Sequence, residues 1–409
     1  MFRRVLRIPV WIQRRRRPET RAILVIGVGG GGGNAVDRMI AARVPGVRFV
    51  ACNTDAQALR RSTAETKIRI GVSTTGGLGS GGDPAVGRRS AEEDEAGIAR
   101  GVAGSDLVFV IAGLGGGTGS GAAPIIGADA GVHGALTIAI VTKPFGFEGA
   151  QRLRNADMAV ADLADSVDAI ITIPNDRVVD VVAEDTSMLD AFRVVDDVLL
   201  QTVQGIIDLL RGTGLVNLDF ADVRAVMHGA GPALVGMGRG SGDNRAIDAA
   251  RRAIASPMLE ANIQGARGIL LNVSGPADLR LSEVLAAADE IRASADPDAN
   301  VIFGASLGTG AEEVVITLIA TGLAWPTASE VAARATKRMA AEARVADLPE
   351  PELAPVEIEP PGGGGRGRKP KVASRSVARK SLTTATARST DAPPVEEISR
   401  PVPSFLRRS

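Results

Sequence analysis

Uninterrupted runs of apolar residues alternate with amphipathic segments through the first half of this sequence. Such runs are typical of strands that are buried on both faces of a parallel sheet. Between them, apolar side chains recur at the spacing of helices. The runs fall at residues 22–26, 107–112, 135–141 and 169–173. The alternation predicts an α/β domain with a mostly parallel sheet.

The helical spacing predicts where the main helices lie. One helix is expected over 34–43 and another over 121–130, each shortly after a strand and a glycine-rich segment. A longer pattern over 187–210 is apolar on more than one side, so this helix is best placed between two domains. Gly212 and Gly214 follow it, as glycines often follow the last turn of a helix.

A second domain of α+β type is expected after this long helix, up to about residue 323. Its helices are predicted over 244–255 and 282–293, and its strands over 268–273, 301–304 and 313–320. These elements are shorter than those of the first domain, and they predict a smaller mixed sheet.

The chain changes in character after the second domain. Residues 347–359 are acidic and rich in proline, and residues 362–388 are basic and rich in small side chains. Such segments bury too little apolar surface to fold alone, so we expect disorder. Apolar residues return around Phe405, beside Arg407 and Arg408, which indicates a docking peptide at the end of a tether.

Composition excludes several classes of function. Basic and acidic residues are balanced at 47 each, and aromatic residues make up only 3% with no tyrosine, so no nucleic-acid partner is indicated. The single cysteine, Cys52, excludes a disulfide framework and fits a reducing, cytoplasmic compartment; we expect it to be buried. His133 and His228 are too few for a histidine-rich metal site and are interpreted as structural or solvent-facing. No apolar run is long enough to span a membrane.

The first seventeen residues are rich in arginine on both sides of a short apolar patch, 8–12. One interpretation is a disordered basic arm or a wrongly assigned start. Another is weak contact of residues 1–17 with anionic lipid through Trp11 and Ile12. An organelle transit peptide is poorly supported, because serine is missing there.

Two glycine-rich segments, 27–34 and 115–121, carry the strongest chemical signal. Glycine lets backbone N–H groups approach a phosphate, and a helix that starts there adds the positive end of its dipole. Two such segments in one domain suggest a nucleotide whose phosphates are held from two sides. A need for tight turns would by itself explain glycine runs of this length poorly. A Walker A loop is excluded, because no Gly-Lys-Ser/Thr sequence occurs.

A dinucleotide-binding fold is the main alternative. The glycines at 27, 29 and 32 match its fingerprint, and Asp55 lies about twenty residues further on, where an acidic residue would bind the ribose. This would make the protein a nicotinamide-dependent oxidoreductase. Five consecutive glycines and the second glycine-rich segment argue against it, and the second domain offers no obvious residue for hydride transfer.

Several segments together resemble one family. Residues 115–121, GGGTGSG, have the form of the tubulin signature, and residues 217–224, NLDFADVR, look like the catalytic loop of FtsZ, the bacterial cell-division tubulins. Further FtsZ-like segments are found at 53–59, 142–149 and 173–176. The resemblance covers about 22–322. The tail at 402–408 is similar to the peptide by which FtsZ proteins bind membrane anchors such as FtsA.

The resemblance implies a site for GTP or GDP in the first domain. Backbone N–H groups and the Thr118 hydroxyl would hold the phosphates, Glu148 would bind the ribose, and Arg152 would lie near the γ-phosphate or the sugar. Asn175, Phe192 and Asp196 would contact guanine, Phe192 by stacking and Asp196 by accepting hydrogen bonds. The phosphate-binding residues would be Gly30, Gly31, Gly32, Gly33, Asn34, Gly116, Gly117, Thr118 and Gly119.

The resemblance also implies that catalysis is shared between subunits. Asn217, Asp219 and Asp222 would enter the nucleotide site of the next subunit, where the two carboxylates and Mg²⁺ would position the attacking water. Taken alone, these residues favour a solvated turn with a helix N-cap. The implied protein is a polymerisation-dependent GTPase that forms head-to-tail filaments in the cytokinetic ring at the bacterial division site, with division regulators as further partners. A nucleotide-binding scaffold that polymerises without turnover is the alternative.

The predicted organisation is tubulin/FtsZ-like and has six parts. They are a basic extension (1–20), a GTP-binding domain (21–186), a central helix (187–213), a C-terminal α+β domain carrying the catalytic loop (214–323), a disordered linker (324–395) and a docking peptide (396–409).

Two segments depart from the family pattern. Residues 76–83 hold more glycine than expected of a loop that senses the γ-phosphate, and residues 228–232 are unusual. Polymer stability or turnover is therefore expected to differ.

Overall fold

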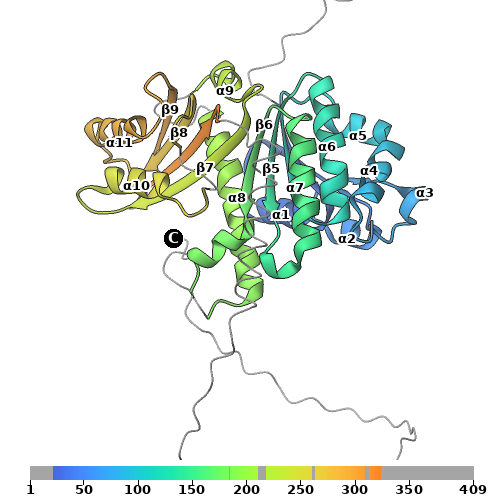
Figure 1. Ribbon diagram of the computed structural model, residues 1–409. Coiled ribbons are helices and arrows are strands. Elements are labelled where there is room, and N and C mark those ends of the chain that lie inside the picture. The colour runs from blue at the N-terminus through green and yellow to red at the C-terminus, as the bar shows by residue number, and fades with distance from the viewer. Residues whose placement is uncertain (1–21, 184, 211–217, 260–262, 309–312, 324–409) are drawn as a thin grey trace, which may run out of the picture. The chain divides into compact units, whose positions relative to one another are not determined.

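The computed structural model describes residues 22–183, 185–210, 218–259, 263–308 and 313–323 (Figure 1). The predicted N-terminal extension, linker and docking peptide lie outside the described residues, as does Asn217.

Six parallel strands form the first half of the sheet, in the order β3-β2-β1-β4-β5-β6. The apolar runs of the sequence correspond to β1, β4, β5 and β6, so the parallel sheet is confirmed. The strands are β1 (Ile23–Val28), β2 (Val47–Asn53), β3 (Thr66–Arg69), β4 (Leu107–Gly113), β5 (Leu136–Lys143) and β6 (Ala169–Pro174).

Helices cover both faces of this half of the sheet (Figure 1). Successive side chains of a strand enter opposite cores: Phe109 of β4 packs with α1 and α8, whereas Val110 packs with α5, α6 and α7. Burial on both faces is the reason that these strands read as continuous apolar runs. The helices are α1 (Gly29–Ala41), α2 (Ala56–Arg61), α3 (Val72–Thr75), α4 (Pro84–Glu93), α5 (Glu95–Val102), α6 (Gly117–Val132), α7 (Ala150–Ala164) and α8 (Met188–Leu210).

Both glycine-rich segments belong to the first turns of helices. α1 begins at Gly29 and α6 begins at Gly117, so the predicted helix starts at Asn34 and Gly121 are wrong. Glycine is about 1 kcal/mol less favourable than alanine inside a helix, which is why the sequence pattern places these residues in loops.

Close packing explains why helices form there nevertheless. A Cβ on Gly32 would lie 2.2 Å from the carbonyl oxygen of Ile111, and a Cβ on Gly119 would lie 2.3 Å from the carbonyl oxygen of Gly113. Only glycine allows the first turns of α1 and α6 to approach the strands this closely. The glycines therefore place both helix starts directly over the ends of β1 and β4.

Cys52 is buried on β2, as predicted. Burial, with a smaller contribution from Asp94, raises the pKa of its thiol to about 12. The side chain behaves as a small apolar residue of the core that also contains Val110 and Ile98.

The long helix α8 lies between the two halves of the molecule, as its apolar pattern indicated. Its buried residues Val195 and Ile206 share one core with Phe109 of the first half and with Leu270 and Ile319 of the second half. The sheet continues as β7-β10-β8-β9 beyond β6. These strands are β7 (Gly231–Gly240), β8 (Gly268–Gly275), β9 (Asn300–Leu307) and β10 (Val314–Thr321).

The strand β7 was not predicted, and its glycines give the reason. They interrupt the apolar run that marks the other strands. A Cβ on Gly238 would lie 1.9 Å from the carbonyl oxygen of Ala249, and one on Gly236 would lie 2.2 Å from that of Ala253. The helix α10 (Arg245–Ile254) therefore packs onto β7 at a distance that excludes side chains.

Asp168, at the start of β6, ties the first half of the molecule to α9 (Phe220–Met227) and β7. Its carboxylate accepts hydrogen bonds from the N–H groups of Thr137 and Gly229, at 2.8 and 3.3 Å, and lies 2.5 Å from Nδ1 of His228. The side chain of His228 pairs with this carboxylate and is 62% exposed, which agrees with its interpretation as structural or solvent-facing. The unusual segment 228–232 includes the junction that this carboxylate holds.

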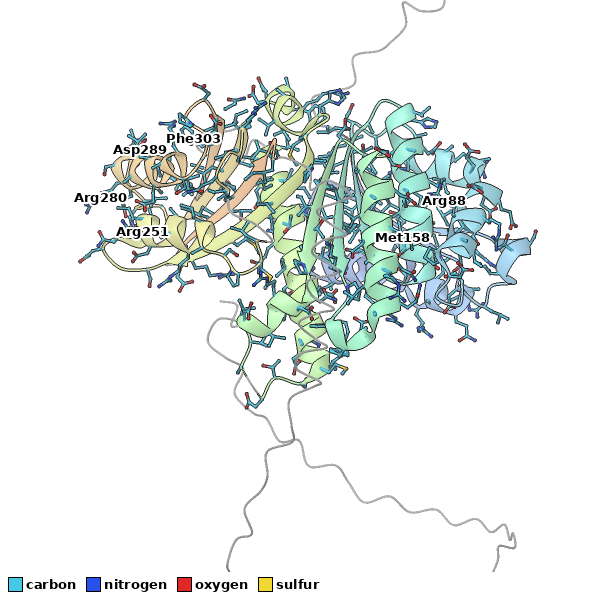
Figure 2. The ribbon with its side chains drawn as sticks, in the orientation of Figure 1. Arg88, Met158, Arg251, Arg280, Asp289 and Phe303 are labelled. Atoms are coloured by element: carbon cyan, nitrogen blue, oxygen red, sulfur yellow. The ribbon has the colours of Figure 1, made fainter. Side chains whose placement is uncertain are left out.

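The outer face of the second half is covered by α10 and α11 (Leu281–Ala293). Ion pairs join the two helices: Arg251, labelled in Figure 2, contacts Glu290 at 3.0 Å, and Arg245 contacts Glu283 at 3.0 Å. Among the described helices, none combines the length and the apolar character that crossing a bilayer requires.

Substitution of Gly32 tests the packing of α1 on the sheet. We expect Gly32→Ala to lower the free energy of unfolding by about 2 kcal/mol or more, because the new Cβ collides with a backbone oxygen. Gly33 is the matched control, since a Cβ there would meet nothing within 4 Å. Gly33→Ala should stabilise the helix by about 0.5–1 kcal/mol. Urea denaturation of both variants measures the difference, and equal effects would contradict the packing argument.

Candidate functional site

A cavity of about 560 Å³ lies at the carboxyl ends of the strands. β1 has β2 on one side and β4 on the other, so the connections after β1 and β4 diverge and leave a crevice between them. The volume is in the range of small-molecule sites. The wall is formed by Gly30, Gly31, Asn34, Ser80, Gly82, Gly113, Leu114, Gly116, Gly117, Thr118, Gly119, Thr142, Pro144, Glu148, Arg152, Asn175, Phe192, Val195, Asp196 and Leu199.

Two helix N-termini meet at one end of the cavity. Gly30 and Gly31 come from the first turn of α1, and Gly117 and Thr118 come from the first turn of α6. Neither helix has a side-chain hydrogen bond that caps its start. The N–H groups of the first turns are therefore available to a ligand, and both dipoles direct their positive ends at the same space. This end of the cavity suits phosphate groups.

The wall residues follow the order of the strands. Gly30 follows β1, Gly116 follows β4, Pro144 follows β5, Asn175 follows β6, and Phe192 lies beyond them on α8. The cavity therefore extends across the ends of four strands, and neighbouring strands in a sheet are about 4.8 Å apart. An elongated ligand would therefore lie across the sheet, with one end at the helix N-termini and the other at α8.

Aromatic side chains shape the end of the cavity at α8. The ring of Phe192 makes an edge-to-face contact with Phe145, with centroids 5.3 Å apart, and Phe145 stacks on Phe147 at 5.1 Å. Phe192 remains 38% exposed. The ring is thus held by Phe145, and its exposed surface can contact a planar ligand.

The same end carries two hydrogen-bond acceptors without partners. Asn175 is buried, and its Oδ1 has no hydrogen bond among the described residues. Within the same part of the chain, no donor reaches the carboxylate of Asp196. Burial raises the pKa of Asp196 to about 6, although Arg38 opposes this rise. A buried amide oxygen beside a half-buried carboxylate favours a ligand that presents N–H donors.

Glu148 and Arg152 lie in the middle of the wall and form an ion pair. The other carboxylate oxygen of Glu148 accepts the N–H of Phe145 at 3.0 Å. These contacts fix the carboxylate between the phosphate end and the aromatic end, where it can accept hydrogen bonds from ligand hydroxyls.

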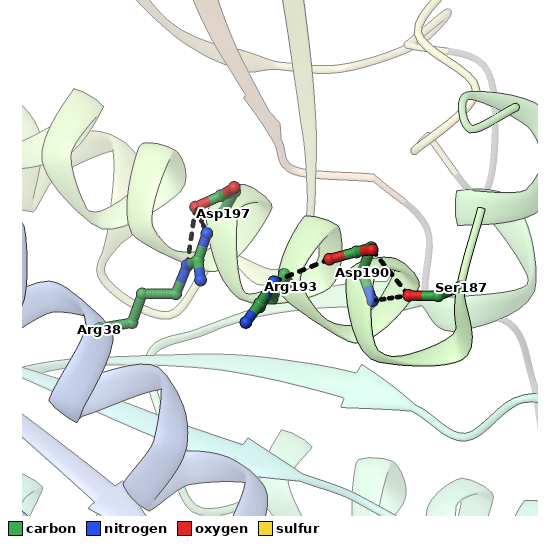
Figure 3. A network of polar contacts seen from close by, with 5 residues as sticks. All are labelled: Arg38, Ser187, Asp190, Arg193 and Asp197. Carbon is green, nitrogen blue, oxygen red and sulfur yellow. Dashed lines mark hydrogen bonds and ion pairs between the residues drawn. The ribbon is translucent and has the colours of Figure 1, made fainter. Parts of the chain in front are cut away.

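Ion pairs hold the start of α8, which carries Phe192 and Asp196, in place (Figure 3). Arg38 of α1 donates two hydrogen bonds to one oxygen of Asp197, at 2.7 and 2.8 Å. The hydroxyl of Ser187 accepts the N–H of Asp190 at 3.1 Å and so caps the first turn. α8 is thereby attached to the helix that forms the opposite end of the cavity.

The structure brings together all residues predicted to hold a nucleotide except two. Gly32 and Gly33 do not line the cavity; Gly32 faces β4 instead. Nucleotide binding by the others stays a prediction. Asp55, the ribose ligand of the dinucleotide alternative, also lies outside the wall. Its carboxylate caps α2 through the N–H groups of Gln57 and Ala58, and these hydrogen bonds lower its pKa.

Several wall residues were not predicted, above all Ser80, Gly82, Thr142 and Pro144. Their segments carried a signal, because 142–149 was singled out for its resemblance and 76–83 for its departure from the family pattern, but no individual role was attached to these side chains. Glycine dominates 76–83 because the backbone is left-handed at positions 76, 77, 79, 81 and 82, with φ between 61° and 87°.

Asp219 and Asp222 lie far from this cavity. They begin α9, and the N–H of the neighbouring Leu218 bonds to Leu209 at the end of α8. Thirteen residues of α8 separate Leu209 from Asp196, which corresponds to about 20 Å along the helix. Both carboxylates are exposed, and Asp222 accepts the N–H of Asp219 at 3.3 Å, so the interpretation as a helix N-cap is confirmed.

The described residues contain no group of three or more His, Cys, Asp or Glu side chains arranged to hold a metal ion. Asp219 and Asp222 alone would provide only two carboxylates. Metal binding by this pair stays a prediction.

Comparisons with known proteins identify both halves of the molecule. The sequence model of the Tubulin/FtsZ family, GTPase domain, matches residues 22–183, and that of the FtsZ family, C-terminal domain, matches residues 231–324. An empty FtsZ dimer from M. jannaschii is 39% identical with a TM-score of 0.71, and the alignment covers 76% of this chain and 90% of that one. A mutant of FtsZ from the same organism is 40% identical with a TM-score of 0.71, covering 74% and 92%.

A more distant structure shares the fold alone. CetZ2 from Haloferax volcanii, solved as a protofilament with GTPγS, is 21% identical with a TM-score of 0.67, and the alignment covers 79% of this chain and 99% of that one. The two family matches and the FtsZ structures decide the assignment: the chain belongs to the Tubulin/FtsZ family of GTPases and has an FtsZ-like structure.

Proposed function

We propose that the protein hydrolyses GTP only when subunits assemble head to tail. The observation that carries this proposal is the separation of about 20 Å along α8 between the cavity and the exposed carboxylates of Asp219 and Asp222. These groups cannot meet within one subunit. Stacked subunits would place the carboxylates of one against the cavity of the next. The dimer and protofilament named among the similar structures support self-association.

Guanine is the base that fits the aromatic end of the cavity. The ionised carboxylate of Asp196 would accept hydrogen bonds from the N1–H and the N2 amino group, while the ring of Phe192 stacks on the base. Adenine offers no donor at N1, so the half-buried carboxylate of Asp196 would face a lone pair. This difference selects GTP over ATP.

The phosphates would lie on the N–H groups at the starts of α1 and α6, and Glu148 would accept hydrogen bonds from the ribose. The carboxylates of Asp219 and Asp222, from the neighbouring subunit, would orient the water that attacks the γ-phosphate. Mg²⁺, when bound, supplies positive charge that offsets the charge on the phosphates. Positioning and charge stabilisation suffice for phosphoryl transfer, so no covalent group of the protein is needed.

The filaments would form the cytokinetic ring at the division site of a bacterial cell, in the cytoplasm. This part of the proposal rests on the family and on the resemblance of residues 402–408 to the FtsZ tail peptide. That peptide would bind a membrane anchor such as FtsA. Residues 1–17 would add weak contact with anionic lipid.

Phosphate release measured against protein concentration tests the central proposal. With GTP, the rate per subunit should be near zero below a threshold and rise above it, and light scattering should rise at the same concentration. ATP should give no release. A rate per subunit that is independent of concentration would place catalysis within one subunit. Assembly without phosphate release would favour the alternative of a scaffold that polymerises without hydrolysing GTP.

Asp196→Asn tests base recognition. Asparagine donates a hydrogen bond where aspartate accepts one, so the variant should lose affinity for GTP by roughly 10- to 100-fold. It should gain affinity for xanthosine triphosphate, whose C2 oxygen accepts that hydrogen bond. Equilibrium binding of both nucleotides measures the exchange. Unchanged GTP affinity would show that Asp196 does not contact the base.

Asp222→Asn tests catalysis by the neighbouring subunit, because the amide oxygen can still cap α9 while the charge is lost. GTP binding should be unchanged, and hydrolysis should fall by roughly 10²- to 10⁴-fold. A mixture of Asp222→Asn subunits and Asp196→Asn subunits should hydrolyse GTP again. The mixture contains GTP for the first variant and a non-hydrolysable analogue of xanthosine triphosphate for the second. The first variant then provides the GTP-bound cavity and the second provides the intact carboxylate. Failure to restore hydrolysis in mixed filaments would contradict a shared site.

A further inference from the structure

The segment 228–232, which departs from the family pattern, closes around a single aspartate. Nδ1 of His228 lies 2.5 Å from Oδ1 of Asp168, and the N–H of Gly229 donates to the same oxygen at 3.3 Å. The N–H of Gly231 donates to the main-chain oxygen of Asp168 at 2.9 Å. Both glycines are left-handed, with φ of 60° and 68°, which lets the chain turn around Asp168 between α9 and β7. Asp168 therefore holds the carboxyl-terminal end of α9.

The sheet fixes this carboxylate from the other side. Oδ2 of Asp168 accepts the N–H of Thr137 at 2.8 Å and the hydroxyl of Thr137 at 3.0 Å. Thr137 lies on β5 and is buried, and its hydroxyl also accepts the N–H of Asp168 at 3.0 Å. One carboxylate oxygen is thus bound to the sheet and the other to the turn after α9. Since a carboxylate only accepts hydrogen bonds, the ring nitrogen of His228 is the donor in its pair with Asp168.

A second contact holds α9 from the other half of the molecule. The hydroxyl of Thr321, on β10, lies 3.2 Å from the carbonyl oxygen of Val226 in the last turn of α9. Val223 and Met227 of the same helix are fully buried in the core that both halves share. The direction of α9 is therefore set near its carboxyl-terminal end, by Asp168 on one side and Thr321 on the other.

Asp219 and Asp222 stand at the opposite end of this helix. The eight residues of α9 span about 12 Å, so a tilt of about 5° at the anchored end would move these carboxylates by about 1 Å. Misplacement of a reacting group by about 1 Å can slow a reaction roughly 100-fold. Contacts at the end of α9 therefore bear on catalysis, although they touch neither the carboxylates nor the nucleotide cavity.

We propose that His228 and Asp168 are positioning residues for the shared reaction. Their contact fixes the direction of α9 and so the place of Asp219 and Asp222 in the cavity of the next subunit. The pair serves the neighbour's nucleotide and not that of its own subunit, because it lies at the amino end of β6 whereas the cavity lies at the carboxyl end. The inference rests on the proposed hydrolysis of GTP by assembled subunits.

His228 is the residue to substitute, because its side chain is 62% exposed and its loss leaves no buried cavity. Removal of the Asp168 carboxylate would instead leave the buried donors of Thr137 unpaired and threaten the fold.

Steady-state hydrolysis of GTP above the assembly threshold tests the proposal. His228→Ala should lower kcat by about tenfold and leave KM, and the GTP affinity of unassembled subunits, unchanged. In His228→Asn the amide nitrogen takes the place of Nδ1 and can donate to Asp168, so kcat should return to the wild-type value. His228→Asp sets two carboxylates against each other and should lower kcat further, by roughly 100-fold.

Mixed filaments show on which subunit's nucleotide the pair acts. In an excess of Asp196→Asn subunits, supplied with the non-hydrolysable xanthosine analogue, nearly every His228→Ala cavity holds GTP and faces an unaltered α9. Hydrolysis per His228→Ala subunit should then equal that of wild-type subunits in the same excess. A defect that persists in this mixture, or full activity of filaments made of His228→Ala alone, would overturn the proposal.

His133→Ala is the matched control. This second histidine is also exposed, and its Nδ1 lies 2.7 Å from the carbonyl oxygen of Asp129 in α6. The variant should leave kcat unchanged, and an equal loss in both alanine variants would contradict a specific role of His228. Wild-type protein that hydrolyses GTP at one rate per subunit at all concentrations would instead refute the proposed function.

Discussion

The close approach of two helix starts to two neighbouring strands is the constraint on which the rest of this structure depends. A Cβ on Gly29 would lie 3.0 Å from the amide nitrogen of Gly119, so even the two helices approach one another at backbone distance. This contact brings uncapped N–H groups of α1 and α6 to one crevice. It also explains why several of these positions, such as Gly32 and Gly119, must be glycine, since a Cβ there would collide with the backbone of β4.

The helix α8 has a second role besides filling the core between the two halves of the sheet. Its first turns bring Phe192 and Asp196 to the cavity, and the segment beyond its last described residue leads to Asp219 and Asp222. The length of one helix therefore sets the distance between the aromatic end of the cavity and the proposed catalytic carboxylates. Arg38, in the last turn of α1, pairs with Asp197 and so attaches α8 to the helix whose first turn lines the other end of the cavity.

Much of the fold could be predicted from the sequence, because parallel strands buried on both faces leave continuous apolar runs. The prediction failed where backbone packing replaced side-chain packing. Helix α1 begins five residues before the predicted start at Asn34, and β7 escaped notice, in both cases because glycines break the apolar pattern. Most residues of the cavity wall could be proposed from resemblance to a family. Ser80 could not, since its place in the wall depends on contact with Thr118, which is remote from it in sequence.

The burial of Cys52 protects its thiol from thiol reagents in the folded protein. Burial raises the pKa of the thiol to about 12, which disfavours the reactive thiolate, and the residue is only 1% exposed. Modification therefore requires β2 to separate from the helices that cover it. The rate at which this single thiol reacts would report how often the nucleotide-binding half of the molecule opens.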